Sequence, residues 1–399
     1  MSRPPLRTAA RLGEVREYYF SRKLREIRVR RAAGEPILNL GIGSPDLPPP
    51  PEAVAALRRD VAEASAHGYQ GYGGTPAWRE ALRTWYRAAY GVDLDDAEVL
   101  PLAGSKEGIV HLALALLEPG TAMLHPDPGY PAYPSAARLA QARSLGYALP
   151  AEGESPAAWA ASLERLVGRA DLRLLFVNSP HMPTGRVLGR DYLTALVAFA
   201  KTRDAVLVSD NAYGYYHPEK PTSLLALPGA REVAVELNSL SKSHHMPGWR
   251  LGVLAGRPDV VHAALQVKSN LDSGQFRPVQ AGAVAALATP WAWHAAQLAE
   301  IAARRRLGGE LLGRLGCEVV GEQSGLFVWA RLPTGFGEGS EAFCDRVLEQ
   351  SGVFFPPGTV FGPRGEGFVR LSLCSPRDVL AEAHARVGAV SFAATTATA

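Results

Sequence analysis

The residues around Lys242 combine an amine with several hydrogen-bond donors. Lys242 closes a run that begins at Asn238, directly after a predicted buried strand; Ser239 and Ser241 stand within the run, and Arg250 follows Lys242 by eight positions. A lysine at a strand end is costly to bury unless it is paired or covalently bound, whereas an isolated lysine extends to the surface. An amine, two hydroxyls and a guanidinium together suit a carbonyl cofactor that carries a phosphate.

A carboxylate and a phenol follow another predicted strand. Asp210 and Tyr213 come after the apolar run 205–208. Alone, Asp210 would be interpreted as a turn residue or a helix cap. Beside a lysine that holds a ring cofactor, its carboxylate can keep a pyridine nitrogen protonated through a hydrogen bond worth roughly 1.5 to 3 kcal/mol. Tyr213 is then placed to donate to a phenolic oxygen on the same ring.

Two further segments supply candidates for binding a phosphate and a ring. Ser105 and Lys106 open a helix-like stretch, 109–117, and a helix start offers free backbone NH groups and the positive end of a dipole. Tyr130 follows the apolar run 121–125, where a tyrosine can also simply pack in a turn. If a cofactor lies beside Lys242, Tyr130 is placed to stack on its ring.

Arg370 lies in an alternating, strand-like segment, 367–372, near the C-terminal end. An arginine in such a strand can point to solvent. Its planar guanidinium nevertheless matches a carboxylate in bidentate geometry. An enzyme that acts on amino acids must recognise the α-carboxylate of every substrate, so Arg370 is the candidate for that contact.

Short apolar runs alternate with helix-like segments between about 120 and 256, which predicts an α/β fold with a mostly parallel sheet covered by helices. The runs lie at 121–125, 172–177, 205–208, 233–237 and 251–255. Ligands of open α/β sheets bind outside the carboxyl ends of the strands, so the polar clusters that follow these runs predict one shared site.

After Pro290 the pattern changes to a long helix followed by short strand-like pieces. This change predicts a smaller α+β domain at the C-terminal end. We therefore expect a large α/β domain over 51–290, a small domain over 291–399, and an N-terminal segment, 1–50, packed with the small domain.

The composition argues against several other classes of protein. The chain has 399 residues, 47% of them hydrophobic, and a net charge of +3. It can bury a large core, but it offers no broad electrostatic surface for nucleic acid or a membrane, and no apolar run approaches the roughly 20 residues of a membrane span. Cys317, Cys344 and Cys374 lack the spacing of a zinc site or a disulfide framework. We expect no metal and a cytoplasmic location.

In this order, the clusters resemble the class I/II aminotransferases, which share the type I fold of enzymes that use pyridoxal 5′-phosphate (PLP). The likeness runs from about Asn39 to Ser372, and its most specific part is Ser-x-Ser-Lys at 239–242 followed by Gly-Trp-Arg-x-Gly at 248–252. Supporting pieces lie at 40–46, 69–79, 178–185 and 357–358. The runs 238–242 and 268–274 are most similar to the branch that contains the LL-diaminopimelate aminotransferases.

The resemblance implies a role for each matched residue. It implies a Schiff base between Lys242 and the cofactor, Asp210 at the pyridine nitrogen and Tyr213 at the phenolic oxygen. The other residues implied to bind the cofactor are Ser105, Lys106, Tyr130, Asn178, Ser239, Ser241, Arg250 and, from the neighbouring subunit of a homodimer, Tyr69. Arg370 and the backbone at Gly43 are implied to hold the substrate carboxylate.

One position departs from the family pattern. The family usually has an asparagine before Pro-Thr-Gly, where it donates a hydrogen bond to the phenolic oxygen, but this chain has Met182. A thioether cannot donate that bond. We expect the bound imine to keep its proton to higher pH than in relatives with asparagine, unless Asn178 or a water takes the role and Met182 only fills space.

The expected reaction is the transfer of an amino group between an L-amino acid and a 2-oxo acid in two half-reactions. The same fold could instead support a β-lyase, racemase or oxidase, because the cofactor supplies the electron sink and the site selects the outcome. An amino-acid-sensing regulator is disfavoured because only about 35 residues precede the core. A nicotinamide dehydrogenase is disfavoured because the glycines near Gly43 lack the dinucleotide-binding spacing.

Overall fold

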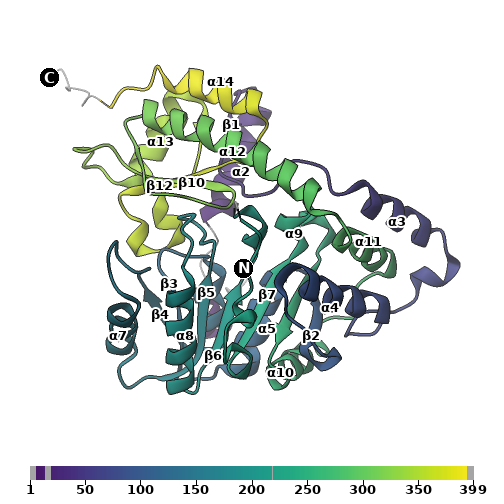
Figure 1. Ribbon diagram of the computed structural model, residues 1–399. Helices are drawn as coiled ribbons and strands as arrows, with labels where there is room; N and C mark the ends of the chain where they lie inside the picture. The colour runs from purple at the N-terminus through teal and green to yellow at the C-terminus, as the bar shows by residue number, and fades with distance from the viewer. Residues whose placement is uncertain (1–5, 14–18, 218, 393–399) are drawn as a thin grey trace, which may run out of the picture.

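The computed structural model describes residues 6–13, 19–217 and 219–392. Figure 1 shows a large unit, in which helices surround a twisted sheet, and a smaller unit packed above it. The long helix α12 (Trp291–Arg314) belongs to the smaller unit and extends across the top of the large one. No helix of the described residues is long and apolar enough to cross a membrane.

The large unit contains a seven-stranded sheet with the order β2-β8-β7-β6-β5-β3-β4. Its strands are β2 (Val99–Leu102), β3 (Thr121–Pro126), β4 (Arg143–Tyr147), β5 (Asp171–Asn178), β6 (Val206–Asp210), β7 (Ala234–Ser239) and β8 (Gly252–Gly256). Strands β4, β3, β5, β6 and β7 are parallel, and β8 and β2 pair antiparallel. The fold is therefore the mostly parallel α/β architecture that the sequence predicts.

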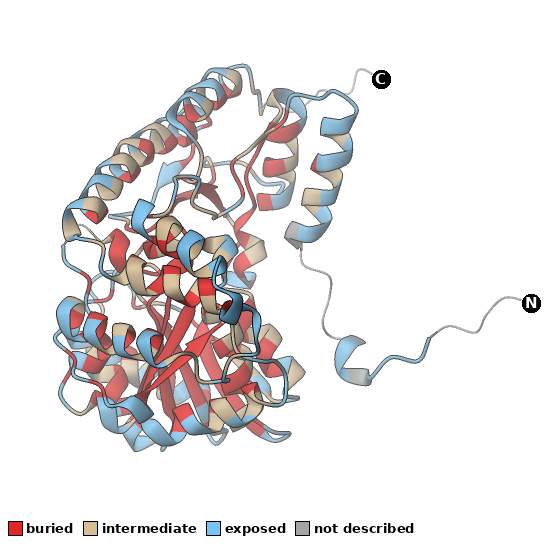
Figure 2. Ribbon diagram, turned by 90° about the vertical axis from the view of Figure 1, so that its right-hand side faces the viewer, coloured by how far each residue is buried: buried red, intermediate tan, exposed pale blue. Residues whose placement is uncertain are grey.

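Helices cover both faces of this sheet. The helices of the large unit are α3 (Pro51–Val61), α4 (Pro76–Tyr90), α5 (Ser105–Leu116), α6 (Ala132–Leu139), α7 (Pro156–Val167), α8 (Arg190–Thr202), α9 (Leu240–Ser243), α10 (Pro258–Lys268) and α11 (Arg277–Leu287). Helix α3 packs on α11 rather than on the sheet. One apolar cluster joins the sheet to α4, α7, α8 and α11, and a second joins it to α5, α6 and α10. Burial on both faces explains why the central strands are almost continuously apolar, and the sheet is the buried centre of the unit in Figure 2.

The smaller unit has two short sheets. In one, β10 (Phe327–Arg331) pairs antiparallel with both β9 (Glu318–Val319) and β12 (Phe368–Ser372). In the other, β1 (Leu38–Asn39) pairs parallel with β11 (Val353–Phe354). Helices α2 (Tyr19–Ala32), α13 (Ser340–Ser351) and α14 (Arg377–Val387) complete the unit with α12.

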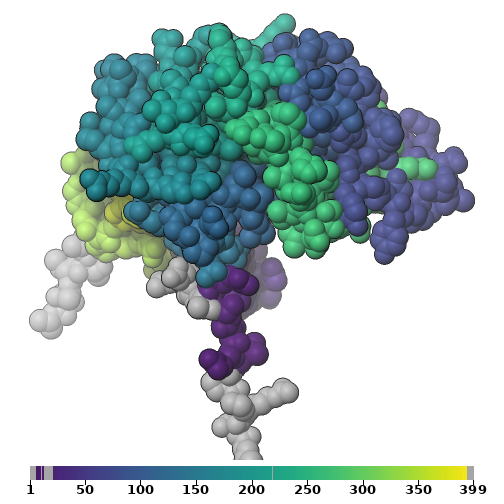
Figure 3. All heavy atoms as spheres, turned by 90° about the horizontal axis from the view of Figure 1, so that it is seen from below, coloured from purple at the N-terminus to yellow at the C-terminus, as the bar shows by residue number. Residues whose placement is uncertain are grey.

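The pairing of β1 with β11 ties the N-terminal segment to the C-terminal unit. The first described residues, including α1 (Ala10–Gly13), project beyond the body of the molecule (Figure 3). We propose 50 and 290 as the domain boundaries, because α3 begins at Pro51 and α12 at Trp291. Parts of the predicted domains, at 1–5, 14–18, 218 and 393–399, lie outside the described residues.

The structure also corrects the predicted strands. Asp210 and Ser239 are the last residues of β6 and β7 rather than residues of the loops that follow. The sequence analysis did not predict β2 and β4. Strand β2 is four residues long and contains Pro101, and β4 is an edge strand with Arg143 and Gly146. Neither has the β-branched, apolar run by which central strands are recognised.

Candidate active site

A cavity of about 320 Å³ lies where the two units meet. Its walls come from α2, the loop after β1, the first turn of α5, the carboxyl ends of β5 and β6, and strands β10 and β12. Among the described residues that line it, the charged ones are Asp210, Lys242 and Arg370. Residues far apart in the sequence thus meet in one place, as the strand-end rule predicts.

Lys242 enters the cavity from the short helix α9. The Ser239 hydroxyl caps this helix by accepting a 3.2 Å hydrogen bond from the Ser241 NH, and the Tyr216 hydroxyl donates to the Lys242 carbonyl at 2.8 Å. The Lys242 ammonium donates to the carbonyl oxygen of Gly43. Burial lowers the pKa of Lys242, and the nearby Arg370 and Arg250 add to that effect. A lowered pKa favours the neutral, nucleophilic amine.

Asp210 presents a buried carboxylate to the same cavity. Its side chain is 4% exposed, and Oδ2 accepts a 2.7 Å hydrogen bond from the Tyr133 hydroxyl. Oδ1 has no hydrogen-bond partner in the described part of the chain. Asn178, paired with Asp210 across β5 and β6, donates from Nδ2 to the Asp210 carbonyl at 2.6 Å. Burial raises the pKa of Asp210 to about 6, against the opposing effect of Tyr133.

Arg370 reaches the cavity from strand β12 and is 4% exposed. Its guanidinium carbon lies 4.0 Å from the ring centre of Phe327 and 4.4 Å from that of Phe361. Nη2 donates to the Gly41 carbonyl at 2.6 Å, and Nη1 lies 3.5 Å from the sulfur of Met182. The two rings pack against the guanidinium group and orient its plane, which suits recognition of a carboxylate.

The first turn of α5 lies beside Arg250. Gly104 precedes the helix with φ +88°, and a Cβ added there would lie 2.5 Å from Nη2 of Arg250. Arg250 donates from Nη2 to the Ala103 carbonyl and from Nη1 to the Pro247 carbonyl, both at 2.9 Å. The helix start with Ser105 and the adjacent guanidinium together form an arrangement that suits an anion.

A family model of the class I and II aminotransferases matches residues 35–387. The chain belongs to this family. The LL-diaminopimelate aminotransferase of Moorella thermoacetica is 37% identical to this aminotransferase over 385 residues, which cover 96% of this chain and 98% of that protein. A similar match, 37% identical over 391 residues, is the LL-diaminopimelate aminotransferase of Gloeobacter violaceus.

Solved structures have the same fold as this aminotransferase. The substrate-bound structure of BacF from Bacillus subtilis superposes with a TM-score of 0.89 at 31% identity, covering 96% of this chain and 98% of that one. The aspartate aminotransferase of Thermus thermophilus with maleate superposes with a TM-score of 0.88 at 26% identity, covering 97% of this chain and all of the other.

As a member of this class, the aminotransferase uses pyridoxal phosphate. The residues around the cavity fit that group. Asp210 offers a buried oxygen that has no partner among the described residues, which matches the protonated nitrogen of a pyridine ring. Lys242 offers a buried amine for the aldehyde, and the start of α5 with Arg250 offers NH donors and positive charge for the phosphate.

Most of the predicted site residues line the cavity. Those that do so are Gly43, Ser105, Tyr130, Asn178, Asp210, Tyr213, Lys242 and Arg370. Ser239, Ser241 and Arg250 lie around it, in the helix cap and beside α5. Lys106 is exposed on the first turn of α5. Tyr69 is 95% exposed and does not line the cavity of its own chain.

The sequence analysis missed several residues that line the site. Tyr133 supports Asp210, and Phe327 and Phe361 enclose Arg370. Leu24 and Ile42 line the cavity from the N-terminal segment. Tyr133 could have been found, because it lies three residues after Tyr130 in the same segment that follows the apolar run 121–125. The phenylalanines and the aliphatic pair resemble ordinary core residues in the sequence.

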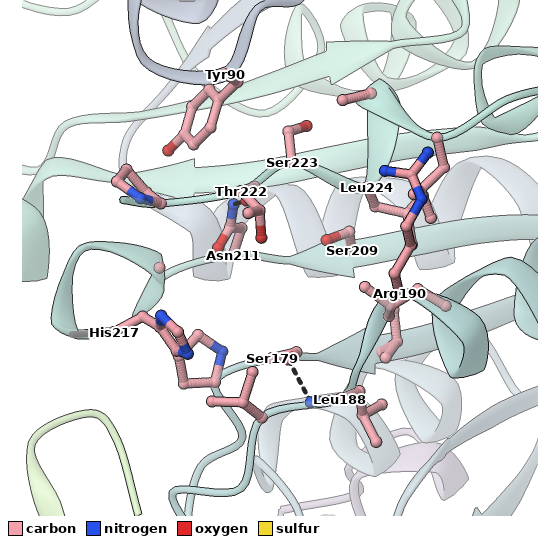
Figure 4. A pocket seen from close by; sticks show the side chains of 18 of the residues that line it. Tyr90, Ser179, Leu188, Arg190, Ser209, Asn211, His217, Thr222, Ser223 and Leu224 are labelled. Atoms are coloured by element: carbon pink, nitrogen blue, oxygen red, sulfur yellow. Dashed lines mark hydrogen bonds between the residues drawn. The ribbon is translucent and has the colours of Figure 1, made fainter. Parts of the chain in front are cut away.

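A second cavity, of about 450 Å³, lies on the other side of strand β6 (Figure 4). Ser209 and Asn211, the neighbours of Asp210 in sequence, line it, because successive side chains along a strand point to opposite faces. Arg190 and His217 also line it. Asp210, Lys242 and Arg370 do not contribute to its walls. The predicted charged site residues therefore line the smaller of these two cavities.

Proposed function

We propose that this aminotransferase transfers the amino group of an L-amino acid to a 2-oxo acid, with Lys242 as the residue that bonds to the cofactor. The observation that carries this assignment is the meeting of the Lys242 amine, the Asp210 carboxylate and the Arg370 guanidinium in one cavity. Amine, carboxylate and guanidinium respectively match the aldehyde of the cofactor, its ring nitrogen and the carboxylate of a substrate.

Each residue has a defined task in this proposal. Arg370 binds the substrate carboxylate and orients the α-carbon toward Lys242. Pyridoxal phosphate, when bound, supplies the ring that accepts the electrons released at the α-carbon. The ionised Asp210 holds a proton on the ring nitrogen, and Tyr133 keeps Asp210 in place. Lys242 would hold the aldehyde of the cofactor, and its free amine would accept and return the proton of the substrate α-carbon as general base and acid.

Dependence on the acceptor tests the reaction type. An amino donor mixed with stoichiometric enzyme should yield one 2-oxo acid per active site, and turnover should continue only when a second 2-oxo acid is added. Continuous release of 2-oxo acid without an acceptor would instead identify a lyase or an oxidase, and inversion of the donor without net loss would identify a racemase.

The walls of the cavity favour a donor with an apolar side chain. Apart from Asp210, Lys242 and Arg370, the described side chains that line it are uncharged, and many are large and apolar: Leu24, Ile42, Tyr130, Met182, Phe327 and Phe361. A second carboxylate or ammonium on the substrate would be desolvated there without an oppositely charged partner among the described lining residues of the same subunit, which is costly. Several relatives are LL-diaminopimelate aminotransferases, but the apolar walls lead us to propose phenylalanine, leucine or methionine as the donor.

Half-reactions with a panel of amino acids test the preference. Phenylalanine, leucine and methionine should convert the bound cofactor faster than aspartate, glutamate or LL-diaminopimelate. Ile42→Lys should raise kcat/KM for glutamate and lower it for leucine. Leu114→Lys is the matched control, because Leu114 is similarly exposed, at 42% against 44%, and does not line the cavity. Faster conversion of LL-diaminopimelate than of every apolar amino acid would contradict the preference.

We also propose a cytoplasmic homodimer in which Tyr69 reaches the phosphate site of the partner subunit. Tyr69 is 95% exposed, so its ring is accessible to a second chain, and tyrosine is enriched at protein–protein interfaces. Tyr72, three residues further along the chain, is 45% exposed, so two tyrosines of this segment are available for contact with a second chain. The three cysteines are free thiols, which suits a reducing compartment.

A further inference from the structure

A buried ion pair lies directly behind the start of helix α5. Lys268, at the end of α10, is 1% exposed, and its ammonium contacts Oε1 of Glu107 at 2.9 Å and Oδ2 of Asp272 at 2.5 Å. Glu107 is in the first turn of α5, two residues after Ser105. His111, one turn further along α5, has Nδ1 3.5 Å from Oε1 of Glu107. A lysine buried to this degree is rare unless it is paired.

Glu107 connects this ion pair to the groups that face the cofactor phosphate. Its Oε2 accepts a hydrogen bond from the backbone NH of Ala103. The carbonyl of the same residue accepts from Nη2 of Arg250 at 2.9 Å. Glu107 therefore fixes the loop that leads into α5, in the way that an acidic residue at the third helical position of a capping box fixes the backbone before it.

The positive charge of Lys268 offsets a repulsion between two carboxylates and the cofactor phosphate. Glu107 and Asp272 place two carboxylates behind the helix start that binds the phosphate, and a phosphate carries the same sign of charge. The Lys268 ammonium neutralises one of them from a position that solvent does not reach. Burial raises the pKa of Glu107, while the ammonium of Lys268 opposes that rise and favours the carboxylate that accepts from Ala103.

We propose that Lys268 is a positioning residue for the cofactor phosphate, which acts through Glu107 on the loop at Ala103 and on Arg250. The inference rests on the proposed function, because it takes the start of α5 as the phosphate site. Lys268 does not touch the phosphate. Its positive charge stabilises the carboxylate of Glu107, which can then accept the hydrogen bond from the backbone NH of Ala103.

The test compares the dissociation constants of PLP and of pyridoxal, which lacks the phosphate, for cofactor-depleted protein, read from visible absorbance. Lys268→Met should weaken PLP about tenfold or more and leave pyridoxal within about twofold. The double variant Lys268→Met/Glu107→Gln removes both charges, and it should restore the affinity for PLP to within about threefold of the wild type. Equal weakening of PLP and pyridoxal, or no rescue in the double variant, would overturn the proposal.

Two further variants keep the test decisive if Lys268→Met does not fold. Asp272→Asn removes one negative charge, and the asparagine can still accept a hydrogen bond from Lys268. PLP should therefore bind about two- to fivefold more tightly, and the affinity for pyridoxal should not change. Unchanged or weaker binding of PLP would contradict the proposal. Lys23→Met is the matched control, because Lys23 also contacts two carboxylates, Glu26 and Asp345, but in the smaller unit. It should leave the affinity for PLP unchanged. Failure of the wild type to bond PLP would instead refute the proposed function.

Discussion

The hydroxyl of Tyr133 donates a 2.7 Å hydrogen bond to Oδ2 of Asp210, and the other carboxylate oxygen, Oδ1, has no partner in the described chain. One oxygen is thus held by the protein and the other is left for the cofactor. In the cofactor-free protein this carboxylate is poorly solvated, because it is buried and one of its two oxygens lacks a hydrogen-bond partner in the described chain.

This arrangement predicts a pH-dependent cost to stability in the cofactor-free protein. Burial raises the pKa of Asp210 from 3.8 to about 6, so the folded state binds the proton more tightly than the unfolded state does. The stabilisation by the protonated form is complete below pH 4 and is lost as the pH rises through about 6. Asp210→Asn should therefore raise the free energy of unfolding by about 1 to 3 kcal/mol at pH 8, and by much less at pH 4.

Thermal or urea unfolding of the cofactor-free protein at the two pH values measures this difference. Asp191→Asn is the control, because Asp191 is exposed on α8 and its substitution should change stability little at either pH. An equal gain for Asp210→Asn at pH 4 and pH 8 would show that the carboxylate is not destabilised by burial. With PLP present the sign should reverse, since the variant loses the ion pair with the ring.

Arg370→Lys is expected to lower kcat/KM for amino acids roughly a hundredfold, chiefly through KM. A lysine keeps the positive charge, but it cannot form two parallel hydrogen bonds or stack between Phe327 and Phe361. Steady-state kinetics measure the effect. Arg331→Lys is the matched control, because Arg331 also lies over a ring, Phe368 at 5.2 Å, in the same sheet but outside the cavity. A similar loss in both variants would mean that Arg370 acts through the fold and not on the substrate.

Much of the site could be predicted because its residue types are specific to the chemistry. Lys242, Asp210 and Arg370 are each costly to bury without a function, and each lies at a position where the apolar pattern of a strand ends or is interrupted. The parallel sheet then brings the strand ends together. Asp210 and Lys242 lie at and just after the ends of neighbouring strands of that sheet, so the rule for strand ends placed them together, whereas Arg370 lies on β12 of the smaller unit and was predicted from the match of its guanidinium to a carboxylate and from the family resemblance.

The remaining features depend on contacts that no local pattern encodes. Phe327 and Phe361 are hydrophobic residues like those of any core, and only the packing of the smaller unit places them against Arg370. The ion pair of Lys268 with Glu107 joins residues 161 positions apart. Strand β2 was missed because it is short and contains Pro101, and β4 because it is a partly exposed edge strand without a continuous apolar run.

Met182→Asn is expected to move the visible absorbance titration of the bound cofactor to lower pH. Met182 lies against Arg370 with its sulfur 3.5 Å from Nη1, and it lines the cavity. An asparagine there can donate a hydrogen bond to the phenolic oxygen of the cofactor and stabilise its negative charge, which a thioether cannot do. Absorbance spectra recorded against pH give the midpoint. A midpoint that is unchanged or raised in the variant would favour Asn178 or a water as the donor.

Mixed dimers test whether Tyr69 serves the partner subunit. Lys242→Ala and Tyr69→Ala should each be strongly impaired alone. When the two are unfolded and refolded together, the heterodimer should contain one intact site, so a statistical mixture should regain about a quarter of wild-type activity. If Tyr69 served its own chain, both sites of the heterodimer would carry a substitution and no activity would return.

The central claim is that Lys242 itself bonds to the cofactor beside Asp210. The most direct measurement is reduction of the PLP-loaded protein with borohydride, which fixes a carbon–nitrogen double bond, followed by proteolysis and mass spectrometry of the peptides. We predict that the added mass of the reduced cofactor lies on Lys242 and that Lys242→Ala carries none. Labelling of a different lysine in the wild type, with Lys242 unmodified, would contradict the account.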